Sequence, residues 1–309
     1  MITLVTGGAG FIGSNLVKLL VEKGHSVVIL DNLSTGYSNN VPISPRVKLV
    51  RGDIRDAATV KSAANGAQVI FHLAASVGNQ RSINDPMTDS MVNILGTLNV
   101  LEAARSAGAR KVVYSSSAAI FGELRYLPIK EDHPVEPDSF YGVSKLGGEK
   151  HSLCYHNIYN LEVICLRYFN VYGVNQRYDA YGNVIPIFAR ELLTGQPLKI
   201  YGDGEQTRDF INVLDVARAN LQAAEADGVS GAFNLGSGNS ITINQLAVMM
   251  QEAAGTRVSV QHVPPRKGDV RHSRADISAV QSAVGFAPRV NLPEGLKEYV
   301  AWVQTEAFS

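Results

Sequence analysis

"ITLVTGGAGFIGSNLVKLLVEKG", residues 2–24, decides the fold class of this chain. The stretch opens with an apolar, β-branched run that predicts a short buried strand, and it closes with helical spacing that stops at Gly24. The glycines between them fit both G-x-G-x-x-G and G-x-x-G-x-x-G: Gly7, Gly8, Gly10 and Gly13. Such glycines allow a tight turn and let the N–H groups of a helix start approach a pyrophosphate. The stretch therefore predicts a strand, a phosphate-binding turn and a helix, in the order that a dinucleotide site requires.

The first half of the chain repeats this alternation of strand and helix. We predict further strands at 26–32, 47–54, 67–75 and 110–117 and further helices at 56–66 and 93–108. Strict alternation with apolar, β-branched strands predicts a parallel sheet covered on both faces, as in a Rossmann-type doubly wound α/β fold. After residue 168 the pattern loosens, and Gly, Pro and Tyr become frequent. We therefore expect a dinucleotide-binding domain at 1–168, joined by segments from about 208–235, and a smaller C-terminal α/β substrate-binding domain at 169–309.

The composition argues against several classes of function. The chain has 309 residues, of which 28 are basic and 28 acidic, so its formal net charge is zero. The basic residues are scattered, which argues against nucleic-acid binding. The two cysteines, Cys154 and Cys165, lack metal-ligand spacing, so we expect no metal site, no disulfide scaffold and a reducing, cytoplasmic location. No apolar run reaches the length of a membrane span, and a strand-turn-helix start explains the first residues better than a signal peptide.

Asp31 stands at the end of the predicted second strand, where a carboxylate can accept hydrogen bonds from both hydroxyls of an adenosine ribose. A carboxylate there would repel a 2′-phosphate, so the sequence favours NAD over NADP. A loop carboxylate or a helix cap is the alternative interpretation of Asp31. Asp53 and Ile54 follow another strand and could border the adenine, but an ordinary turn explains them equally well.

Two short motifs carry the chemistry. In "YGVSK", Tyr141 and Lys145 are four residues apart, so on a helix they share a face. A nearby ammonium stabilises a phenolate and lowers the pKa of the phenol toward a value useful for a general base. "SSSAAIFG", residues 115–122, follows a predicted strand, and ligands bind at the carboxyl ends of such strands. Its serines could be strand-end residues bonded to local backbone, or one of them could transfer a proton.

The sequence resembles the extended short-chain dehydrogenase/reductase family, and within it the nucleotide-sugar epimerases of the UDP-hexose 4-epimerase type. The resemblance covers nearly the whole chain and rests on "TGGAGFIG", Asp31, "HLAA", "NILGTLNV", "SSSAAIFG", "YGVSK" and "RYFNVYG". It implies that Tyr141 is the catalytic base and that Ser117 is the hydroxyl of the catalytic set. It also implies that Lys145 binds the nicotinamide ribose and lowers the pKa of the tyrosine.

The same resemblance implies which residues bind cofactor and substrate. The expected NAD contacts are Gly7, Gly10, Phe11, Ile12, Gly13, Asp31, Asn32, Ser34, Thr35, Gly36, Asp53, Ile54, Leu73, Ala74, Ala75, Asn93, Tyr141, Lys145 and Tyr168. The expected contacts with a UDP-sugar substrate are Ser117, Asn170, Val184, Tyr201, Arg208, Arg266, Asp269 and Ser273. In similar enzymes Tyr201 packs on the uracil, and Arg208 and Arg266 meet the diphosphate. Asp269 binds a uridine ribose hydroxyl, and Asn93 matches the structural and active-site Asn of the family.

The reaction implied by the resemblance is epimerisation at C4 of a UDP-hexose. Tyr141 removes the proton from the sugar O4, directly or through Ser117, and hydride passes from C4 to NAD. The transient 4-keto sugar swings about its diphosphate linkage and takes the hydride back on its other face. Ser115 and Ser116 are then expected to bond to local backbone.

Other reactions on the same fold stay open. Many hexose dehydratases place an acid and a base where this chain has Ala118 and Ala119, and an alanine cannot transfer a proton. Glu123 lies close to Ala118 and Ala119 in the sequence, so a dehydratase that uses this glutamate stays an alternative. A UDP-glucuronate epimerase or decarboxylase would need a basic group for the carboxylate, for which Arg81 is a candidate, although an ordinary loop arginine is the better interpretation. A non-catalytic NAD-binding sensor is remote, because such proteins tend to lose the Tyr or Lys that this chain keeps.

Ser273 bears on the choice of sugar. In similar epimerases the residue a few positions after the "GD" turn borders the C2 substituent, and a small side chain leaves room for an acetamido group. We therefore expect UDP-GlcNAc and UDP-GalNAc to be accepted, with UDP-Glc and UDP-Gal as further substrates. The resemblance also implies a homodimer formed through a helix pair that includes the helix of Tyr141.

Overall fold

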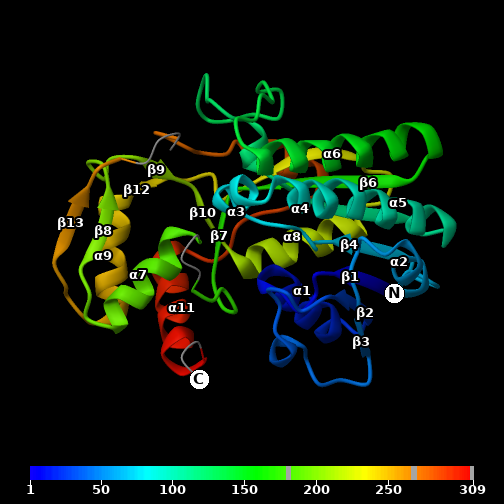
Figure 1. Ribbon diagram of the computed structural model, residues 1–309, viewed down its shortest axis with the longest axis horizontal. Coiled ribbons are helices and arrows are strands. Elements are labelled where there is room, and N and C mark those ends of the chain that lie inside the picture. Colours follow the sequence, from blue (N-terminus) through cyan, green and yellow to red (C-terminus); the bar gives the residue numbers. More distant parts are fainter. Residues whose placement is uncertain (179–181, 266–269, 307–309) are drawn as a thin grey trace.

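A seven-stranded parallel sheet forms the centre of the computed structural model, which describes residues 1–178, 182–265 and 270–306 (Figure 1). Its strand order is β11-β6-β5-β4-β1-β2-β3. The strands are β1 (Ile2–Thr6), β2 (Ser26–Asp31), β3 (Val47–Arg51), β4 (Val69–His72), β5 (Lys111–Ser117), β6 (Glu162–Tyr168) and β11 (Gly231–Leu235). Every neighbouring pair in the sheet is parallel. The predicted Rossmann-type sheet is therefore confirmed, and its strand order reverses between β1 and β4.

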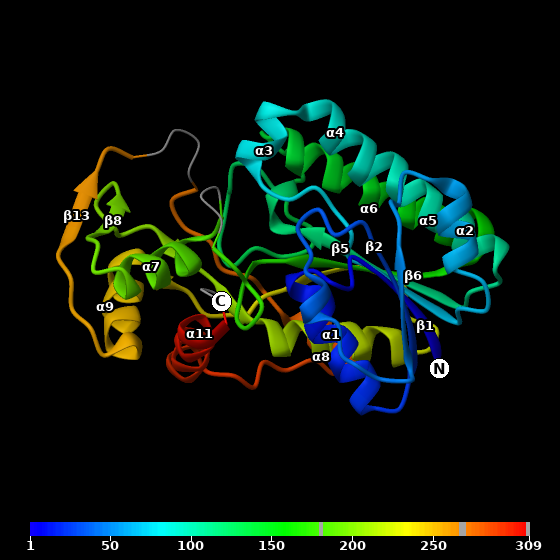
Figure 2. The same cartoon turned by 60° about the horizontal axis from the view of Figure 1, so that its bottom comes forward.

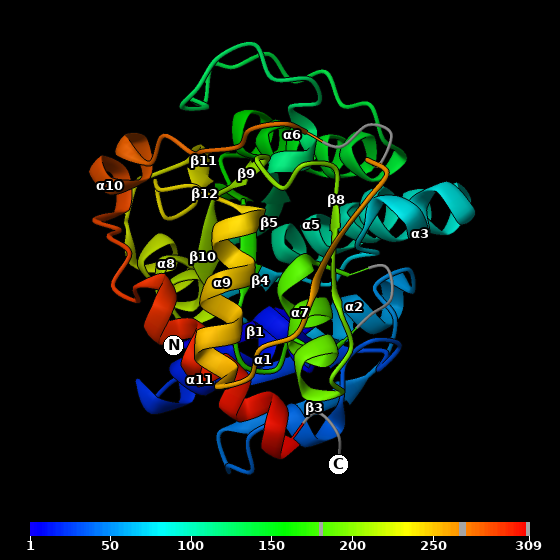
Figure 3. The same cartoon turned by 90° about the vertical axis from the view of Figure 1, so that its left-hand side faces the viewer.

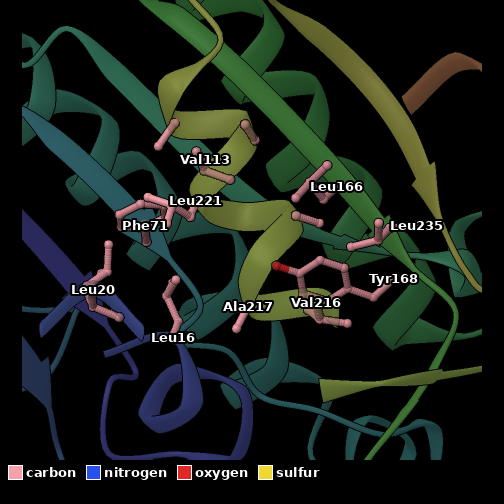
Figure 4. Close-up of a cluster of buried hydrophobic side chains, with 14 of the residues drawn as sticks. Leu16, Leu20, Phe71, Val113, Leu166, Tyr168, Val216, Ala217, Leu221 and Leu235 are labelled. Atoms are coloured by element: carbon pink, nitrogen blue, oxygen red, sulfur yellow. The ribbon is translucent and has the colours of Figure 1, made fainter. Parts of the chain in front are cut away.

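Helices cover both faces of the sheet, as Figure 2 shows. One face carries α2 (Ala57–Ala63), α5 (Thr97–Ser106) and α6 (Phe140–Tyr159), and the other carries α1 (Phe11–Glu22) and α8 (Val213–Glu225). Leu16 and Leu20 of α1, Phe71 of β4 and Leu221 of α8 are fully or almost fully buried in one cluster beneath the sheet (Figure 4). Because both faces are covered, the strands are apolar along most of their length, which is why their sequences lack alternation.

Two short helices and a wide turn precede α5 and were not predicted. They are α3 (Asn79–Asn84), α4 (Pro86–Ser90) and the π-helical segment η2 (Met91–Gly96). The side chain of Asp85 caps α4 by accepting from the N–H of Thr88 at 2.9 Å, and Pro86 occupies the first turn. The predicted helix at 93–108 is thus α5 with a π-helical turn before it, entered through an Asp-Pro helix start.

The C-terminal part forms a second, smaller core (Figure 3). Its strands are β7 (Asn170–Tyr172), β8 (Leu198–Tyr201), β9 (Thr207–Arg208), β10 (Phe210–Asn212), β12 (Ile241–Thr242) and β13 (Val260–Val263), paired as β10-β7, β12-β9 and β13-β8. Its helices are α7 (Val184–Leu193), α9 (Ile243–Ala254) and α11 (Leu292–Glu306), whereas α10 (Ser278–Val284) packs against β11 and α8 of the large core. The short turns η1 (Ser38–Asn40) and η3 (Ala118–Ile120) lie in the first half of the chain. Phe188, Leu246, Met250 and Tyr299 are buried together in this core.

The chain crosses between the two cores more than once. After β10 it returns to the large sheet, where α8 packs against α1 and β11 pairs with β6. A domain boundary at residue 168 stays a proposal. Within the described ranges, no helix combines the length and the apolar character needed to cross a membrane.

Candidate active site

The site lies at the carboxyl ends of the parallel strands, next to the point where the strand order reverses. The turn after β1 and the loop after β4 meet here, since the N–H of Ala74 donates to Thr6 Oγ1 at 3.2 Å. Ser117 ends β5 close by. A crevice at a reversal of strand order is where open α/β sheets bind nucleotides.

The glycine-rich turn has the shape of a pyrophosphate cradle. Gly7 has φ of +70°, and a Cβ there would lie 2.7 Å from the main-chain N of Ala74. A Cβ on Gly13 would lie only 2.1 Å from the carbonyl oxygen of Gly7, so the turn and α1 can approach this closely only without side chains. The N-cap of helix α1 is Gly10, which has no side chain to cap the helix, so the first N–H groups of α1 remain available for an anion. These residues fit NAD.

Asp31 fixes the rim of this cradle. Its Oδ2 accepts from the N–H of Ala9 at 2.9 Å, and its Oδ1 accepts from the N–H of Leu33 at 2.8 Å. The alternative interpretation of Asp31, a carboxylate that binds loop backbone, is therefore correct in part. Each oxygen keeps a further lone pair that can accept from a ribose hydroxyl. The rest of the expected adenosine loop folds back on the cradle, since Tyr37 N donates to Ala9 O at 3.0 Å and Gly36 lies against the same residue.

Three expected cofactor residues have other contacts. The Asp53 carboxylate accepts two hydrogen bonds from Arg55, at 2.9 and 2.8 Å, and these hold its pKa well below its usual range. This favours the interpretation of Asp53 as an ordinary turn. The Ile54 side chain is buried in the core. The Tyr168 side chain also lies in the core (Figure 4), where its hydroxyl donates to Asn220 Oδ1 at 2.9 Å, and the expected contact of this residue with NAD stays a prediction.

Ser117 and Tyr141 bring two hydroxyl groups into the same site. Ser117 is the last residue of β5, and its Oγ accepts from the N–H of Ala119 at 3.1 Å. Tyr141 lies in the first turn of α6, which Ser139 caps, and its own N–H donates to Ser82 Oγ at 3.1 Å. The Ser117 hydroxyl lies near enough to the Tyr141 hydroxyl to lower the pKa of the tyrosine. The two groups can therefore pass a proton to a substrate hydroxyl between them.

Burial acts against the charged forms of both α6 residues. It raises the pKa of Tyr141 to about 12, and the Asp89 carboxylate raises it as well. It lowers the pKa of Lys145 to about 8, against the opposing effect of Asp89. The Lys145 ammonium lies 4.5 Å from the centre of the Tyr114 ring, where a cation is attracted to the ring face. The sequence predicted the pairing of Tyr141 and Lys145 on one helix but gave no sign of the roles of Asp89 and Tyr114.

Asn93 holds the loop after β4 in place. Its Oδ1 accepts from Ser76 N at 2.9 Å, and its Nδ2 donates to Ser76 O at 2.9 Å and to Ser144 Oγ at 3.0 Å. Of the other two serines of "SSSAAIFG", Ser115 donates to the main-chain oxygen of His72 on β4, so its partner is backbone, as expected, but lies 43 residues away rather than nearby in the chain. Ser116 instead donates to a carboxylate, Glu149 Oε2, at 2.6 Å, so its expected backbone role is wrong.

Glu149 and Arg167 form a buried ion pair behind the catalytic residues. Arg167 Nη2 lies 2.8 Å from Glu149 Oε1, and its Nε donates to Oε2 at 3.1 Å. Both side chains are almost completely buried. Because Glu149 lies four residues after Lys145 on α6, the pair ties the catalytic helix to β6.

We expect Glu149→Gln to lower the free energy of unfolding by about 3 kcal/mol, because it leaves the arginine buried without its counter-charge. Urea denaturation followed by circular dichroism measures this change. The control is Glu136→Gln, which breaks the exposed pair of Glu136 and Arg125, joined at 2.7 Å. Equal losses of stability in the two variants would contradict the importance of burial.

The expected substrate residues lie on the C-terminal part. Asn170 starts β7 and donates to Asp209 O at 3.1 Å, and Arg208 lies in β9, where it donates to Thr207 O at 2.8 Å. The further positions are Val184 at the start of α7, Tyr201 at the end of β8, and Ser273, whose N–H donates to Thr207 O at 3.1 Å. Arg266 and Asp269 lie outside the described residues. In the part of the chain that the structure describes, no cluster of three or more His, Cys, Asp or Glu side chains is arranged to hold a metal ion.

Comparisons with known proteins agree with this geometry. The model of the NAD-dependent epimerase/dehydratase family matches residues 3–236. UDP-glucose 4-epimerase of Mycolicibacterium smegmatis is 40% identical over 312 residues, which cover 99% of this chain and 100% of that protein. The solved structure of UDP-N-acetylglucosamine 4-epimerase from Methanobrevibacter ruminantium, in complex with UDP-N-acetylmuramic acid, is 36% identical with a TM-score of 0.95 and covers 98% of both chains. A dTDP-glucose 4,6-dehydratase from Streptomyces venezuelae with NAD bound is 32% identical with a TM-score of 0.92, covering 99% of this chain and 98% of that one.

Proposed function

The chain belongs to the NAD-dependent epimerase/dehydratase family, and we propose that within this family it is a UDP-hexose 4-epimerase. NAD is its cofactor. The observation that carries the proposal is the nearness of the Ser117 and Tyr141 hydroxyls, together with Ala118 and Ala119 directly after Ser117. The pair can move a proton on a sugar hydroxyl, and the alanines supply no acid or base for an elimination.

The chain's own residues provide the cofactor site. The turn from Gly7 to Gly13 and the free N–H groups at the start of α1 would hold the diphosphate. Asp31 would hold the adenosine ribose, and Lys145 the nicotinamide ribose. NAD held there would supply reversible hydride transfer at C4 of the sugar.

Tyr141 is the proposed base. It takes the proton from O4 of the sugar, directly or through Ser117, and gives it back when the alcohol is restored on the opposite face. The raised pKa of the buried phenol favours its protonated form in the free protein, so a positive charge in the site is needed to stabilise the phenolate. The Lys145 ammonium is the group on this chain placed to supply part of that charge.

A dehydratase would need further proton transfer at C5 and C6. Family members include dehydratases, so family membership alone does not decide the reaction. Ala118 and Ala119 form the turn η3 directly after Ser117, where hexose dehydratases usually carry their acid and base. We therefore prefer epimerisation to elimination.

Product analysis by mass tests this proposal. The enzyme is incubated with UDP-Glc, UDP-GlcNAc and UDP-glucuronate, with dTDP-glucose as a control. The products are separated, and their masses are measured by mass spectrometry. Epimerisation gives a second sugar nucleotide of unchanged mass. Loss of one water or one CO₂ would replace the proposal with a dehydratase or a decarboxylase, and no turnover with NAD bound would indicate a sensor.

Ser273 supports a substrate with an N-acetyl group. Its small side chain is 9% exposed, and its main chain is bonded to β9, next to Arg208. We expect Ser273→Tyr to lower kcat/KM for UDP-GlcNAc by at least about 10-fold, because the ring fills the space for the acetamido group, while UDP-Glc changes far less. Steady-state rates on both substrates measure the effect, with Ser273→Ala as the control that keeps the space open. A full UDP-GlcNAc rate in Ser273→Tyr would contradict the assignment.

A homodimer is also part of the proposal. Apolar side chains are exposed on the adjoining elements α4, η2 and α6: Met87, Met91, Leu95, Val143 and Ile158. Such a surface is typical of a protein–protein contact. Sedimentation at micromolar concentration distinguishes the dimer from a monomer. Both cysteines are free thiols in the structure, which suits the proposed cytoplasmic location.

A further inference from the structure

We propose that Asp89 is a positioning residue whose buried negative charge holds Lys145 in place as an ammonium ion at the catalytic site. The inference rests on the proposed function, in which Lys145 must be charged to bind the nicotinamide ribose and to stabilise the phenolate. Asp89 makes no hydrogen bond to Tyr141 or Ser117, and its proposed role is its effect on Lys145, in addition to its raising of the pKa of Tyr141.

Asp89 is a carboxylate in the interior with few direct partners. Its side chain is 0% exposed, on α4, which packs against α6. One oxygen, Oδ1, accepts from Asn93 Nδ2 at 3.2 Å. The other, Oδ2, has no partner in full hydrogen-bond geometry among the described residues, although the Ser144 and Ser76 hydroxyls lie near enough to lower the pKa of the carboxyl. Burial raises that pKa.

A hydrogen-bond chain connects Asp89 to the catalytic helix. Asn93 Nδ2 bonds both Asp89 and Ser144 Oγ, and Ser144 Oγ in turn donates to Tyr141 O at 3.1 Å. Ser144 is the residue directly before Lys145. The carboxylate is thus fixed with respect to the turn of α6 that carries both catalytic side chains.

Lys145 lies in a site where its charge needs support. It is 3% exposed, with its ammonium over the Tyr114 ring and its main-chain oxygen bonded to the Tyr114 hydroxyl at 3.2 Å. The titratable groups that interact with it or with its ring neighbour are Asp89 on α4, Tyr141 and Glu149 on α6, Cys165 on β6, His72 on β4 and Tyr114 on β5. Glu102 on the packed helix α5 bonds instead to Arg105.

Of the two carboxyl groups in this set, Asp89 is the one without an ion-pair partner among the described residues. Burial raises the pKa of the Cys165 thiol well above its usual value, so the thiol stays neutral. Burial lowers the pKa of His72 to about 3, so the imidazole is neutral too. The Glu149 carboxylate is paired with Arg167. Of the nearby charges, Asp89 has the largest effect in raising the pKa of Lys145.

The competing explanation is that Asp89 is a neutral acid, a structural hydrogen-bonding group only. The two explanations differ in what happens when the carboxyl is replaced by an uncharged amide of the same shape. Loss of a neutral acid leaves the titration of Lys145 unchanged. Loss of a nearby anion lowers the pKa of the lysine by at least about one unit.

The test is a pH titration of Lys145 in the full chain, as purified and saturated with NAD. Lysine labelled with ¹³C at Cε is observed by NMR, and the Lys145 signal is assigned by its absence in Lys145→Arg. The variants are Asp89→Asn and, as a second replacement in case the first fails to fold, Asp89→Ser. The control is Asp85→Asn, which removes an exposed charge at the start of the same helix and keeps the cap.

We expect the lysine to titrate at least about one pH unit lower in the Asp89 variants and at the wild-type pH in Asp85→Asn. The alkaline limb of the epimerase pH profile should move down by the same amount. An unchanged Lys145 titration in the Asp89 variants, or an equal shift in Asp85→Asn, would overturn the proposal. Because the NMR titration needs no sugar, it stands or fails independently of which reaction the enzyme catalyses.

Discussion

Tyr141→Phe lowers the rate of epimerisation by at least about 10³-fold, which is the largest effect we expect from a single substitution. The phenol is the group that takes the proton from the sugar O4, and a phenyl ring cannot. The ring itself remains, and the capping contacts of α6 with Ser139 and Ser82 use main-chain groups, so the fold stays intact. Initial rates of epimer formation measure the loss.

The matched control is Tyr159→Phe, at the end of the same helix, where the side chain is half exposed. It should keep the wild-type rate. NAD binding, followed by fluorescence or calorimetry, should be nearly unchanged in Tyr141→Phe. A variant with near-normal turnover would show that Tyr141 is not the base, whereas loss of NAD binding would show that the substitution disturbs the whole site.

Gly13→Ala lowers the affinity for NAD by about 100-fold, since roughly 3 kcal/mol of strain follows from placing a methyl group into a closed backbone contact. The added Cβ would lie 2.1 Å from the Gly7 carbonyl oxygen, and neither partner is a side chain that can rotate away. Helix α1 must therefore move off the turn, which removes its N–H groups from the diphosphate position. Calorimetric titration with NAD measures the change.

Gly147→Ala is the control for this effect. Its Cβ would meet only the flexible end of the Ile94 side chain, at 3.3 Å, and it lies within α6, where alanine favours the helix. We expect this variant to bind NAD as the wild type does. Similar NAD affinities for the two alanine variants would mean that the close approach of α1 and the turn is not what forms the cofactor site.

The fold and the centre of the site followed from local patterns in the sequence. Apolar β-branched runs, helical spacing and the glycines of the first turn are features of a few neighbouring residues, and each predicts its own element. The helical spacing of Tyr141 and Lys145 likewise places both side chains near Ser117 once α6 begins at Ser139.

What the sequence did not show depends on contacts between distant segments. The Tyr168 side chain lies in the core, and its hydroxyl bonds to Asn220 on α8, 52 residues further along the chain. Ser116 faces inward toward Glu149, 33 residues further along the chain, and no local pattern marks that partner. Tyr114 on β5 and Asp89 on α4 both act on Lys145 of α6, and these three residues are far apart in the sequence. The π-helical segment η2 that follows α4 has no local sequence pattern that predicts it.

The most direct test of the central claim is the reaction with UDP-GlcNAc in D₂O, followed by NMR and mass spectrometry of the products. The account predicts that UDP-GlcNAc and UDP-GalNAc interconvert to a constant ratio with no change of mass, no deuterium bound to sugar carbon and no net reduction of NAD, because the hydride removed from C4 is the one returned. Deuterium bound to sugar carbon together with loss of water would contradict it and identify the protein as a dehydratase.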